Sequence, residues 1–491
     1  MGKVTGFMEF ERDNNKEIEP LKRILNFDEF HILMSKKARS EQASRCMDCG
    51  IPFCQYGKPL NGMTAGCPLF NLIPEFNEHI YHNNYKQALD RLLKTNNFPE
   101  FTGKVCPAPC EASCTCGLNG DPVSIKENES VIIEEAFKEG YIKPYVVKNR
   151  LNYKIAVIGS GPSGLAVADT LNKRGYQVTV YEKNDRIGGL LMYGIPNMKL
   201  EKDIIYRRID MMKEEGIEFI CNYSVDTKRT ANKLLKEYDR VVLACGANLP
   251  RDINVDNRDA KNIYFAVDYL SGVTKSLLNS NLEDKSFVST KGKNVVIIGG
   301  GDTGNDCVGT AIRLGCKSVT QIEMMPAMPK ERASNNPWPT WPRVHKVDYG
   351  QQESIAVFKE DPRIYETTVN KFIKNKKDEL TGVEIIKVKF VNKDGKRSLE
   401  MIEESKKIID ADIVLIAAGF IGTKKEIVDS FGLELTNRNC VVADDNNKTT
   451  NDKIYVTGDM YSGQSLVVKA IASGRDVAKA IDTSFMGYTN I

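Results

Sequence analysis

The spacing of hydrophobic and polar residues divides the chain into a helical first part and a longer part that alternates strands with helices. Apolar side chains recur at helical spacing in residues 77–95 and 130–140, which predicts amphipathic helices there. From about residue 150 the pattern changes, and residues 153–184 are typical of a strand, a glycine-rich turn, a helix and a second strand. A similar stretch covers residues 293–326. The two stretches form an internal repeat of one supersecondary element.

Further apolar runs complete this plan. Residues 240–247 and 412–420 predict strands that close the two units, and residues 453–481 predict a final strand, turn and helix. The expected fold class is therefore α/β, with two Rossmann-like dinucleotide-binding domains that follow an α-helical domain.

Composition adds few constraints. The length of 491 residues favours about three domains. The chain is 41% hydrophobic and 27% charged, and its net charge of +3 gives no sign of a nucleic-acid partner. The N-terminus lacks the apolar segment of a signal peptide, and no apolar run is long enough to span a bilayer. We expect a cytoplasmic protein that binds neither nucleic acid nor membrane.

Cysteine is concentrated near the start of the chain, where eight of the thirteen cysteines lie between positions 46 and 116. They form two sets, Cys46, Cys49, Cys54 and Cys67, then Cys106, Cys110, Cys114 and Cys116. Disulfides are disfavoured in the cytosol. Zinc sites usually use two C-x2-C pairs, but here only Cys46 and Cys49 are so spaced. Proline follows Cys67 and Cys106, as in ferredoxins, which favours iron–sulfur clusters over the zinc alternative.

The glycine-rich turns carry the signal for dinucleotides. Gly159, Gly161 and Gly164 follow an apolar strand and open a helix, whose N-terminus favours a pyrophosphate. Glu182 ends the next strand, eighteen residues after Gly164, where an acidic side chain accepts a ribose hydroxyl.

The second turn has the same spacing. Gly299, Gly301 and Gly304 precede a helix, and Glu323 ends the following strand nineteen residues after Gly304. Two such units in one chain suggest one flavin and one nicotinamide. A flavin accepts electrons as a pair and releases them singly, which suits a chain that also holds iron–sulfur centres. Hydride transfer needs no general acid or base, so we assign no catalytic side chain.

The order of these units resembles the two-dinucleotide-binding flavoprotein reductases, in which the NAD(P) domain is inserted within the FAD domain. Residues 456–470 resemble the closing FAD motif of that family, 244–247 its chain crossing, and 188–196 a segment along the flavin. The expected bounds are 1–148 for the helical iron–sulfur domain, 149–290 and 423–491 for the FAD domain, and 291–422 for the NAD(P) domain. The remaining cysteines are isolated, so an exit through a dithiol is not expected: Cys221, Cys245, Cys307, Cys316 and Cys440.

On this resemblance, two sets of residues bind the nucleotides. The expected FAD residues are Gly159, Ser160, Gly161, Pro162, Ser163, Gly164, Glu182, Lys183, Gly189, Leu190, Gly194, Ile195, Gly246, Asp459, Gln464, Ser465, Leu466 and Val467. The expected NAD(P) residues are Gly299, Gly301, Asp302, Thr303, Gly304, Glu323, Arg332 and Gly419. Glu323 favours NADH because its carboxylate repels a 2′-phosphate, whereas Arg332 is a candidate clamp for that phosphate. We expect NADH rather than NADPH.

From end to end the chain resembles the small (beta) subunit of glutamate synthase. The motifs that carry the likeness are MGKVTGFMEFER, CMDCGIPFC, GCPLFNLIPEFN, FTGKVCPAPCEASCTCG, VSIKENE and, at 335–353, NNPWPTWPRVHKVDYGQQE. The resemblance implies an electron-input subunit that oxidises NAD(P)H at FAD and passes electrons through two [4Fe–4S] clusters. The large (alpha) subunit would receive them and make L-glutamate from L-glutamine and 2-oxoglutarate.

The cluster ligands follow from a second resemblance, to the N-terminal domain of dihydropyrimidine dehydrogenase. It implies one cluster on Cys46, Cys49, Cys54 and Cys114, and a second on Cys67, Cys106, Cys110 and Glu129. Cys116 is the alternative eighth ligand. Two alternative functions share the architecture, the NAD(P)H-oxidising subunit of a pyrimidine reductase and that of an electron-bifurcating ferredoxin–NAD(P) oxidoreductase. An alternative of another class is a non-catalytic redox-sensing flavoprotein.

Overall fold

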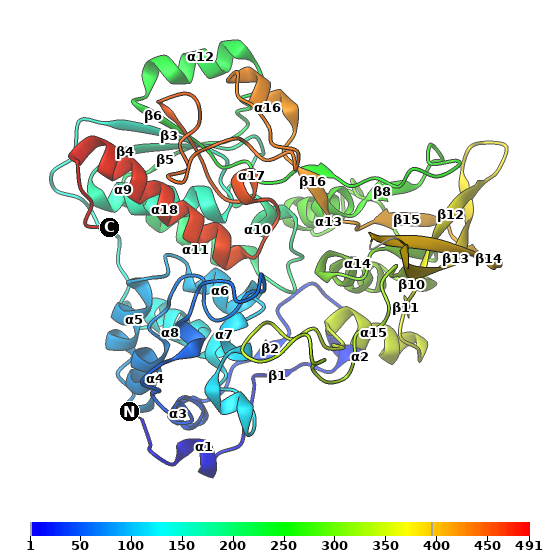
Figure 1. Cartoon of the computed structure of the whole chain (residues 1–491), viewed down its shortest axis with the longest axis horizontal. Coiled ribbons are helices and arrows are strands. Elements are labelled where there is room, and N and C mark those ends of the chain that lie inside the picture. Colours follow the sequence, from blue (N-terminus) through cyan, green and yellow to red (C-terminus); the bar gives the residue numbers. More distant parts are fainter. Residues whose placement is uncertain (1, 394–395) are drawn as a thin grey trace.

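The computed structural model describes residues 2–393 and 396–491. Its first domain consists of short helices joined by long loops, drawn in blue and cyan in Figure 1. The helices are α1 (Gly6–Glu9), α2 (Pro20–Arg23), α3 (Lys36–Ser44), α4 (Ile73–Tyr81), α5 (Tyr85–Leu93), α6 (Pro99–Val105), α7 (Pro109–Ala112) and α8 (Ile125–Lys138), with 3-10 helices η1 (Phe53–Gln55) and η2 (Thr115–Leu118). Strands β1 (Lys16–Glu17) and β2 (His31–Ile32) form a small antiparallel pair.

Two of these helices differ from the sequence expectation. The stretch 77–95 is not one helix, because α4 ends at Tyr81 and Asn83 takes a left-handed conformation with φ 57° before α5 begins. Helix α8 begins at Ile125, five residues before the expected start at 130. The apolar spacing indicates helix on both sides of this turn, and the left-handed Asn83 separates α4 from α5.

The first dinucleotide-binding domain is built on a parallel sheet in the order β17-β6-β3-β4-β5. Its strands are β3 (Lys154–Ile158), β4 (Gln177–Tyr181), β5 (Glu218–Ile220), β6 (Arg240–Leu243) and β17 (Ile454–Val456). Its helices are α9 (Pro162–Arg174), α10 (Leu190–Tyr193), α11 (Lys202–Glu214), α12 (Lys228–Glu237), α16 (Lys425–Ser430), α17 (Asp459–Ser462) and α18 (Val467–Met486). The strand from the end of the chain thus completes a sheet begun 300 residues earlier, as expected for an inserted domain.

The second dinucleotide-binding domain has a parallel sheet in the order β11-β10-β9-β15-β8. Its elements are β8 (Ile263–Phe265), α13 (Ala266–Ser280), β9 (Asn294–Ile298), α14 (Asp302–Arg313), β10 (Ser318–Ile322), α15 (Tyr349–Phe358), β11 (Arg363–Ile364) and β15 (Ile413–Ile416). An antiparallel sheet of β12 (Thr367–Lys374), β13 (Leu380–Lys393) and β14 (Lys396–Asp410) extends from it at the right of Figure 1. Strands β7 (Leu249–Pro250) and β16 (Phe420–Gly422) pair where the chain enters and leaves this domain.

One expected boundary is corrected by this topology. Strand β8 precedes the expected domain start at residue 291, yet it pairs with β15 in the second dinucleotide-binding sheet. The β7–β16 pair lies where the chain passes from one parallel sheet to the other, ahead of β8. The glycine fingerprint identified the first nucleotide-binding strand of this domain but not the strand and helix that come before it.

The helical domain and the first dinucleotide-binding domain share one hydrophobic core. Buried residues of α4, α5 and α8, such as Phe76 and Ile132, belong to the same cluster as Leu165 and Leu171 of α9. At this junction Arg208 of α11 forms a buried ion pair with Glu100 of α6. The two domains are therefore fixed against each other. Among the described residues, no helix combines the length and the apolar character needed to cross a membrane.

Candidate functional site

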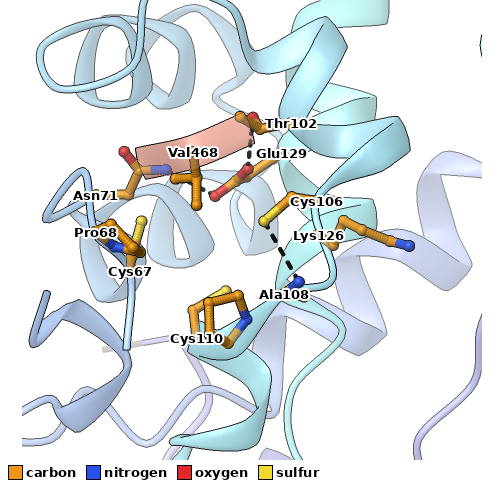
Figure 2. Close-up of a pocket in the computed structure, with 11 residues that line it drawn as sticks. Cys67, Pro68, Asn71, Thr102, Cys106, Ala108, Cys110, Lys126, Glu129 and Val468 are labelled. Atoms are coloured by element: carbon orange, nitrogen blue, oxygen red, sulfur yellow. Dashed lines mark hydrogen bonds between the residues drawn. The ribbon is translucent and has the colours of Figure 1, made fainter. Parts of the chain in front are cut away.

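Two separate cavities in the helical domain are lined by sulfur. The first, which we call the Glu129 cavity, is enclosed mainly by residues between Cys67 and Glu129. Its lining includes the donor side chains of Cys67, Cys106, Cys110 and Glu129. Figure 2 shows the three sulfurs and the Glu129 carboxylate turned toward the same space.

The second, the Cys46 cavity, is lined by five cysteines: Cys46, Cys49, Cys54, Cys114 and Cys116. Each cavity therefore draws on both cysteine-rich stretches of the sequence. The four expected ligands of one cluster line the Cys46 cavity, and the four expected ligands of the other line the Glu129 cavity.

Local backbone contacts explain why the two stretches interleave. The Cys67 N–H donates to the Cys54 carbonyl oxygen at 2.8 Å, so neighbouring main-chain segments carry ligands of different cavities. Gly66 has φ 62° and lies so close to the Tyr56 carbonyl that a Cβ would overlap it. The Gly66 N–H also donates to Ser113 Oγ at 2.7 Å, which ties the first stretch to the residue before Cys114.

The structure separates the two candidates for the eighth ligand. Cys116 lines the Cys46 cavity, and its Sγ donates to the Arg45 carbonyl oxygen at 3.4 Å. Glu129 lines the other cavity, where Asn71 Nδ2 donates to one carboxylate oxygen at 2.8 Å and Thr102 Oγ1 to the other at 3.2 Å. Burial raises the pKa of Glu129 to about 7. Glu129 therefore lies in the cavity that contains three cysteines, whereas Cys116 lies in the cavity that contains four others.

The donor sets fit clusters rather than single ions. Among residues 2–393 and 396–491, no three Cys, His, Asp or Glu side chains are grouped closely enough to hold one metal ion. The donors instead surround a volume, as ligands of a multi-iron cluster do. Burial raises the pKa of Cys46 and of Cys106 to about 12, so their thiolates require a cationic partner. The iron of a bound cluster would supply that positive charge.

In the first glycine-rich turn the main chain lies very close to the neighbouring segment of the sheet. A Cβ on Gly159 would overlap the Ala244 carbonyl of the neighbouring strand, and the residue has φ 104°. The carboxylate of Glu182 accepts hydrogen bonds from the Ser160 N–H at 3.2 Å and from Ser160 Oγ at 2.6 Å. Gly161 caps α9, in whose first turn Pro162, Ser163 and Gly164 lie. The glycine-rich turn, the N-terminus of α9 and the Glu182 carboxylate are therefore adjacent in space. Lys183 is the next residue after Glu182.

The other expected FAD residues approach this turn from two directions. Gly189 lies against Gly161, and α10 follows it with Leu190, whose carbonyl accepts the N–H groups of Gly194 and Ile195 at 2.8 and 2.9 Å. At the chain end, Gly458 is so close to Ser163 that a Cβ would contact its hydroxyl at 2.6 Å.

The closing motif continues from that contact. Ser465 Oγ donates to Asp459 at 3.3 Å, and burial raises the pKa of Asp459 to about 6. Leu466 and Val467 begin α18. Gly246 follows β6 with φ 72°, and its carbonyl accepts Thr423 Oγ1 at 3.4 Å. The Oε1 of Gln464 accepts the Phe420 N–H at 2.8 Å, next to Gly419, so this motif meets the end of the inserted domain.

Two residues that the sequence analysis did not select belong to this region. Val468, which lies inside the closing motif but is not among the expected FAD residues, lines the Glu129 cavity. Lys202 is buried, and its Nζ donates to the carbonyls of Leu191 and Ile195 at 2.9 and 2.7 Å, which fixes both ends of α10. A valine in a helix and a lysine six residues past a motif carry no sequence signal of these contacts.

The second glycine-rich turn repeats the geometry of the first. A Cβ on Gly299 would overlap the Ala417 carbonyl, and the Gly300 N–H donates to Glu323 Oε2 at 2.8 Å. Gly301 caps α14, and Asp302, Thr303 and Gly304 form its first turn. Glu323 therefore accepts a main-chain N–H of the second turn, as Glu182 does in the first turn.

Arg332 is engaged elsewhere. Its guanidinium donates to the carbonyls of Thr340 at 2.7 Å and of Ala112 at 3.3 Å. The segment 326–348, which we call the Pro/Trp loop, is thereby held against the helical domain. Trp341 N–H donates to the Thr64 carbonyl at 2.8 Å, and Ser113 Oγ donates to the Pro339 carbonyl at 2.6 Å. A phosphate contact would require Arg332 to leave these carbonyls, so the structure gives no support to the expected clamp.

Two parallel sheets, each with a glycine-rich turn, define the class of pyridine nucleotide flavoprotein oxidoreductases, here preceded by a cluster-binding domain. Residues 153–474 match the family of pyridine nucleotide-disulphide oxidoreductases, and residues 23–141 match the 4Fe-4S cluster domain II of dihydropyrimidine dehydrogenase. In fold the chain is similar to Mycobacterium tuberculosis FprA in complex with NADPH, with a TM-score of 0.53 and 17% identity over 69% of this chain and 86% of that one.

Relatives identify the family more narrowly. The chain is 46% identical to the glutamate synthase [NADPH] small chain of Bacillus subtilis, over 99% of both chains. It is 33% identical to that of Escherichia coli, over 94% of this chain and 95% of the other. It is also 45% identical to glutamate synthase [NADH] of Saccharomyces cerevisiae, over 99% of this chain and 22% of that longer protein. The chain belongs to the glutamate synthase small-chain family.

Several expectations are thereby confirmed. The fold class and the family are those inferred from the sequence, and the chain is an oxidoreductase. The expected cofactors, FAD, NADH or NADPH, and [4Fe–4S] clusters, are those of this class, which sets the zinc alternative aside.

Proposed function

We propose that this chain is the electron-input subunit of a glutamate synthase, in which it oxidises NAD(P)H and supplies electrons to a large subunit. That subunit makes L-glutamate from L-glutamine and 2-oxoglutarate. The observation that carries the proposal is the pair of cysteine-lined cavities, one of which is also lined by Val468 of the closing FAD motif. The match with a longer yeast protein supports a lasting association with a partner, since the matching region there is part of one chain.

Each cavity holds one cluster in this proposal. The ligands are Cys46, Cys49, Cys54 and Cys114 in one, and Cys67, Cys106, Cys110 and Glu129 in the other. When bound, FAD accepts two electrons as a hydride and releases them one at a time to [4Fe–4S] clusters, each of which carries one electron. Asn71 and Thr102 orient the Glu129 carboxylate through their hydrogen bonds. Cys116 remains a spare thiol.

The position of the two cavities supports one direction of electron flow. Val468 extends the closing FAD motif into the wall of the Glu129 cavity, so this cavity is the inner one. Cys46 and Cys49 are partly exposed, whereas Cys67, Cys106 and Cys110 are buried. The Cys46 cavity is therefore the outer one, from which a partner can be reached.

The nucleotides follow the two glycine-rich turns. The first turn, Glu182 and the segment from Asp459 to Val467 hold FAD, and the second turn and Glu323 hold the nicotinamide nucleotide. Because Glu323 carries a negative charge at the ribose position and Arg332 is engaged elsewhere, we propose a preference for NADH.

The domain bounds and the location complete the proposal. The helical domain covers 1–148, the FAD domain 149–250 and 423–491, and the NAD(P) domain 251–422. Free thiols and oxygen-sensitive clusters suit a reducing compartment, which supports the cytoplasm.

The decisive experiment is anaerobic reconstitution of the chain with iron, sulfide and FAD, followed by titration with NADH and NADPH. We expect the chain alone to reduce an artificial acceptor, and glutamate to form only when the large subunit is added. Steady acceptor reduction without glutamate formation in the complete mixture would favour the ferredoxin or pyrimidine oxidoreductase alternatives. No reduction of any acceptor would favour the redox sensor.

A further inference from the structure

Asn77 of helix α4 is a buried polar residue in the lining of the Cys46 cavity. Ile73 and Pro74, one helical turn earlier, line the cavity too. Apart from the cysteines this lining is mostly apolar, and its hydrogen-bonding side chains are those of Asn77 and Thr115. Thr115 is partly exposed and can reach water, whereas Asn77 is 0% exposed. The amide of Asn77 therefore depends on partners inside the protein.

Two hydrogen bonds determine how this amide is oriented. Arg39 Nη1 donates to Asn128 Oδ1 at 3.2 Å, and Asn128 Nδ2 donates to Asn77 Oδ1 at 2.7 Å. A guanidinium can only donate, so the Asn128 atom that faces it is the oxygen, and the atom that faces Asn77 is the nitrogen. That nitrogen can only donate in turn. The Asn77 oxygen is therefore held toward Asn128, and the Asn77 nitrogen is directed elsewhere.

The amide nitrogen of Asn77 is buried, and among residues 2–393 and 396–491 it has no hydrogen-bond partner. Leaving a buried N–H group unpaired is costly. The cavity that Asn77 lines offers the missing acceptor, because the sulfurs of a bound cluster carry negative charge and accept hydrogen bonds. The unpaired nitrogen thus points to a cluster independently of the cysteines.

We propose that the Asn77 amide donates a hydrogen bond to a sulfur of the cluster in the Cys46 cavity and so raises the reduction potential of that cluster. This inference rests on the proposed function. The step concerned is the gain of one electron, supplied by NAD(P)H through FAD, and no covalent bond forms or breaks. Because the sulfurs share the added negative charge, the hydrogen bond is stronger in the reduced state. Arg39 and Asn128 are positioning residues that hold the amide in this orientation.

The first test compares the reconstituted full-length chain with Asn77→Leu, which has a similar volume and no donor. Both are titrated anaerobically with a low-potential reductant while the reduced clusters are followed by electron paramagnetic resonance. The signal that persists in Glu129→Ala identifies the cluster of the Cys46 cavity. In Asn77→Leu we expect the one-electron reduction of this cluster to become about tenfold less favourable, a downward shift of about 59 mV. The other cluster should keep its potential.

Asn305→Leu is the matched control. Asn305 of α14 is also a buried asparagine whose amide nitrogen lacks a partner among the described residues, but it lines neither cavity. Its oxygen accepts the Gly350 N–H at 2.9 Å, so the substitution removes the same group at a comparable site. Both potentials should stay at the wild-type values. No shift in Asn77→Leu, or an equal shift in Asn305→Leu, overturns the inference.

A second test decides the matter if Asn77→Leu binds no cluster. Asn128→Asp leaves the cavity lining unchanged, but an aspartate beside Arg39 can only accept, so the Asn77 amide should turn its nitrogen toward residue 128. We expect the potential to fall as in Asn77→Leu.

Pulsed electron paramagnetic resonance on chains that carry the heavy nitrogen isotope in asparagine detects the hydrogen bond itself. The reduced wild-type cluster should show a coupling to labelled nitrogen that Asn128→Asp loses, an effect that a nearby charge alone would not produce. A wild-type cluster without this coupling, or an unchanged potential in Asn128→Asp, overturns the inference. A wild-type chain that binds no cluster would instead refute the proposed function.

Discussion

At the scale of single residues, Glu129 and Cys116 are the two candidates for one coordination position. The geometry assigns them to different cavities. We predict that Glu129→Ala loses the inner cluster, because three cysteines remain there, while Cys116→Ala retains both clusters. Iron analysis of the two reconstituted variants should then differ by about four iron atoms per chain. Full iron content in Glu129→Ala, or a loss in Cys116→Ala, would reverse the assignment.

Glu323 sets the second prediction at this scale. One carboxylate oxygen accepts the Gly300 N–H at 2.8 Å and the other accepts the Met325 N–H at 2.7 Å, so glutamine, with a single acceptor oxygen, removes the charge and keeps one of these two hydrogen bonds. Glu323→Gln should therefore raise the ratio of kcat/KM for NADPH to that for NADH about tenfold, equivalent to about 1.4 kcal/mol. The control is Glu182→Gln in the other turn, measured on flavin-bound enzyme, which should leave the ratio unchanged. An unchanged ratio in Glu323→Gln would remove this carboxylate from nucleotide selection.

Single residues also mark what the sequence leaves undetermined. Glu182 and Glu323 are found from spacing because a strand and a turn of fixed length place them. The burial of Arg45, the cavity of Cys116 and the contact of Val468 depend on loops from distant segments. A local pattern cannot specify such contacts.

At the scale of elements, the Pro/Trp loop, which leads from β10 to α15, packs against the helical domain. Trp338 packs against Phe53, with ring centroids 4.8 Å apart, next to Cys54, which we propose as a cluster ligand. Asn336 Nδ2 also donates to the Trp341 carbonyl at 2.9 Å, which stabilises the bend of the loop. The Pro-rich sequence indicates a rigid connection, and the contacts identify what it connects.

This arrangement makes Arg332 a structural residue of the loop. We predict that Arg332→Ala lowers the melting temperature of the reconstituted protein, because carbonyls of residues 112 and 340 lose their charged donor. The preference between NADH and NADPH should not change. The exposed neighbour Lys330 provides the control, since Lys330→Ala should alter neither quantity. A specific loss of NADPH activity in Arg332→Ala would restore the phosphate clamp.

At the scale of the whole molecule, the contact between the helical domain and the first dinucleotide-binding domain keeps the inner cavity next to the closing FAD motif. The shared core and helix α18, which contacts both α9 and α6, hold this position (Figure 1). The order of domains follows from the sequence motifs, but this packing does not. Glu100 and Arg208 are ordinary charged positions in amphipathic helices until the fold buries them together.

The buried pair gives the last prediction. Glu100→Gln leaves the Arg208 guanidinium buried without a counter-charge, which should destabilise the protein by about 3–5 kcal/mol. The double variant Glu100→Leu with Arg208→Leu removes both charges and should recover much of that loss. Asp210→Asn breaks an exposed pair with Lys213 and should cost about 0–1 kcal/mol. Thermal unfolding of the three variants measures these differences in stability. The rates of flavin reduction by NADH and of cluster reduction, recorded separately, measure electron transfer between the flavin and the inner cluster. If the junction positions the inner cluster, Glu100→Gln should slow cluster reduction more than flavin reduction, whereas equal slowing of both would mean that the pair stabilises the fold alone.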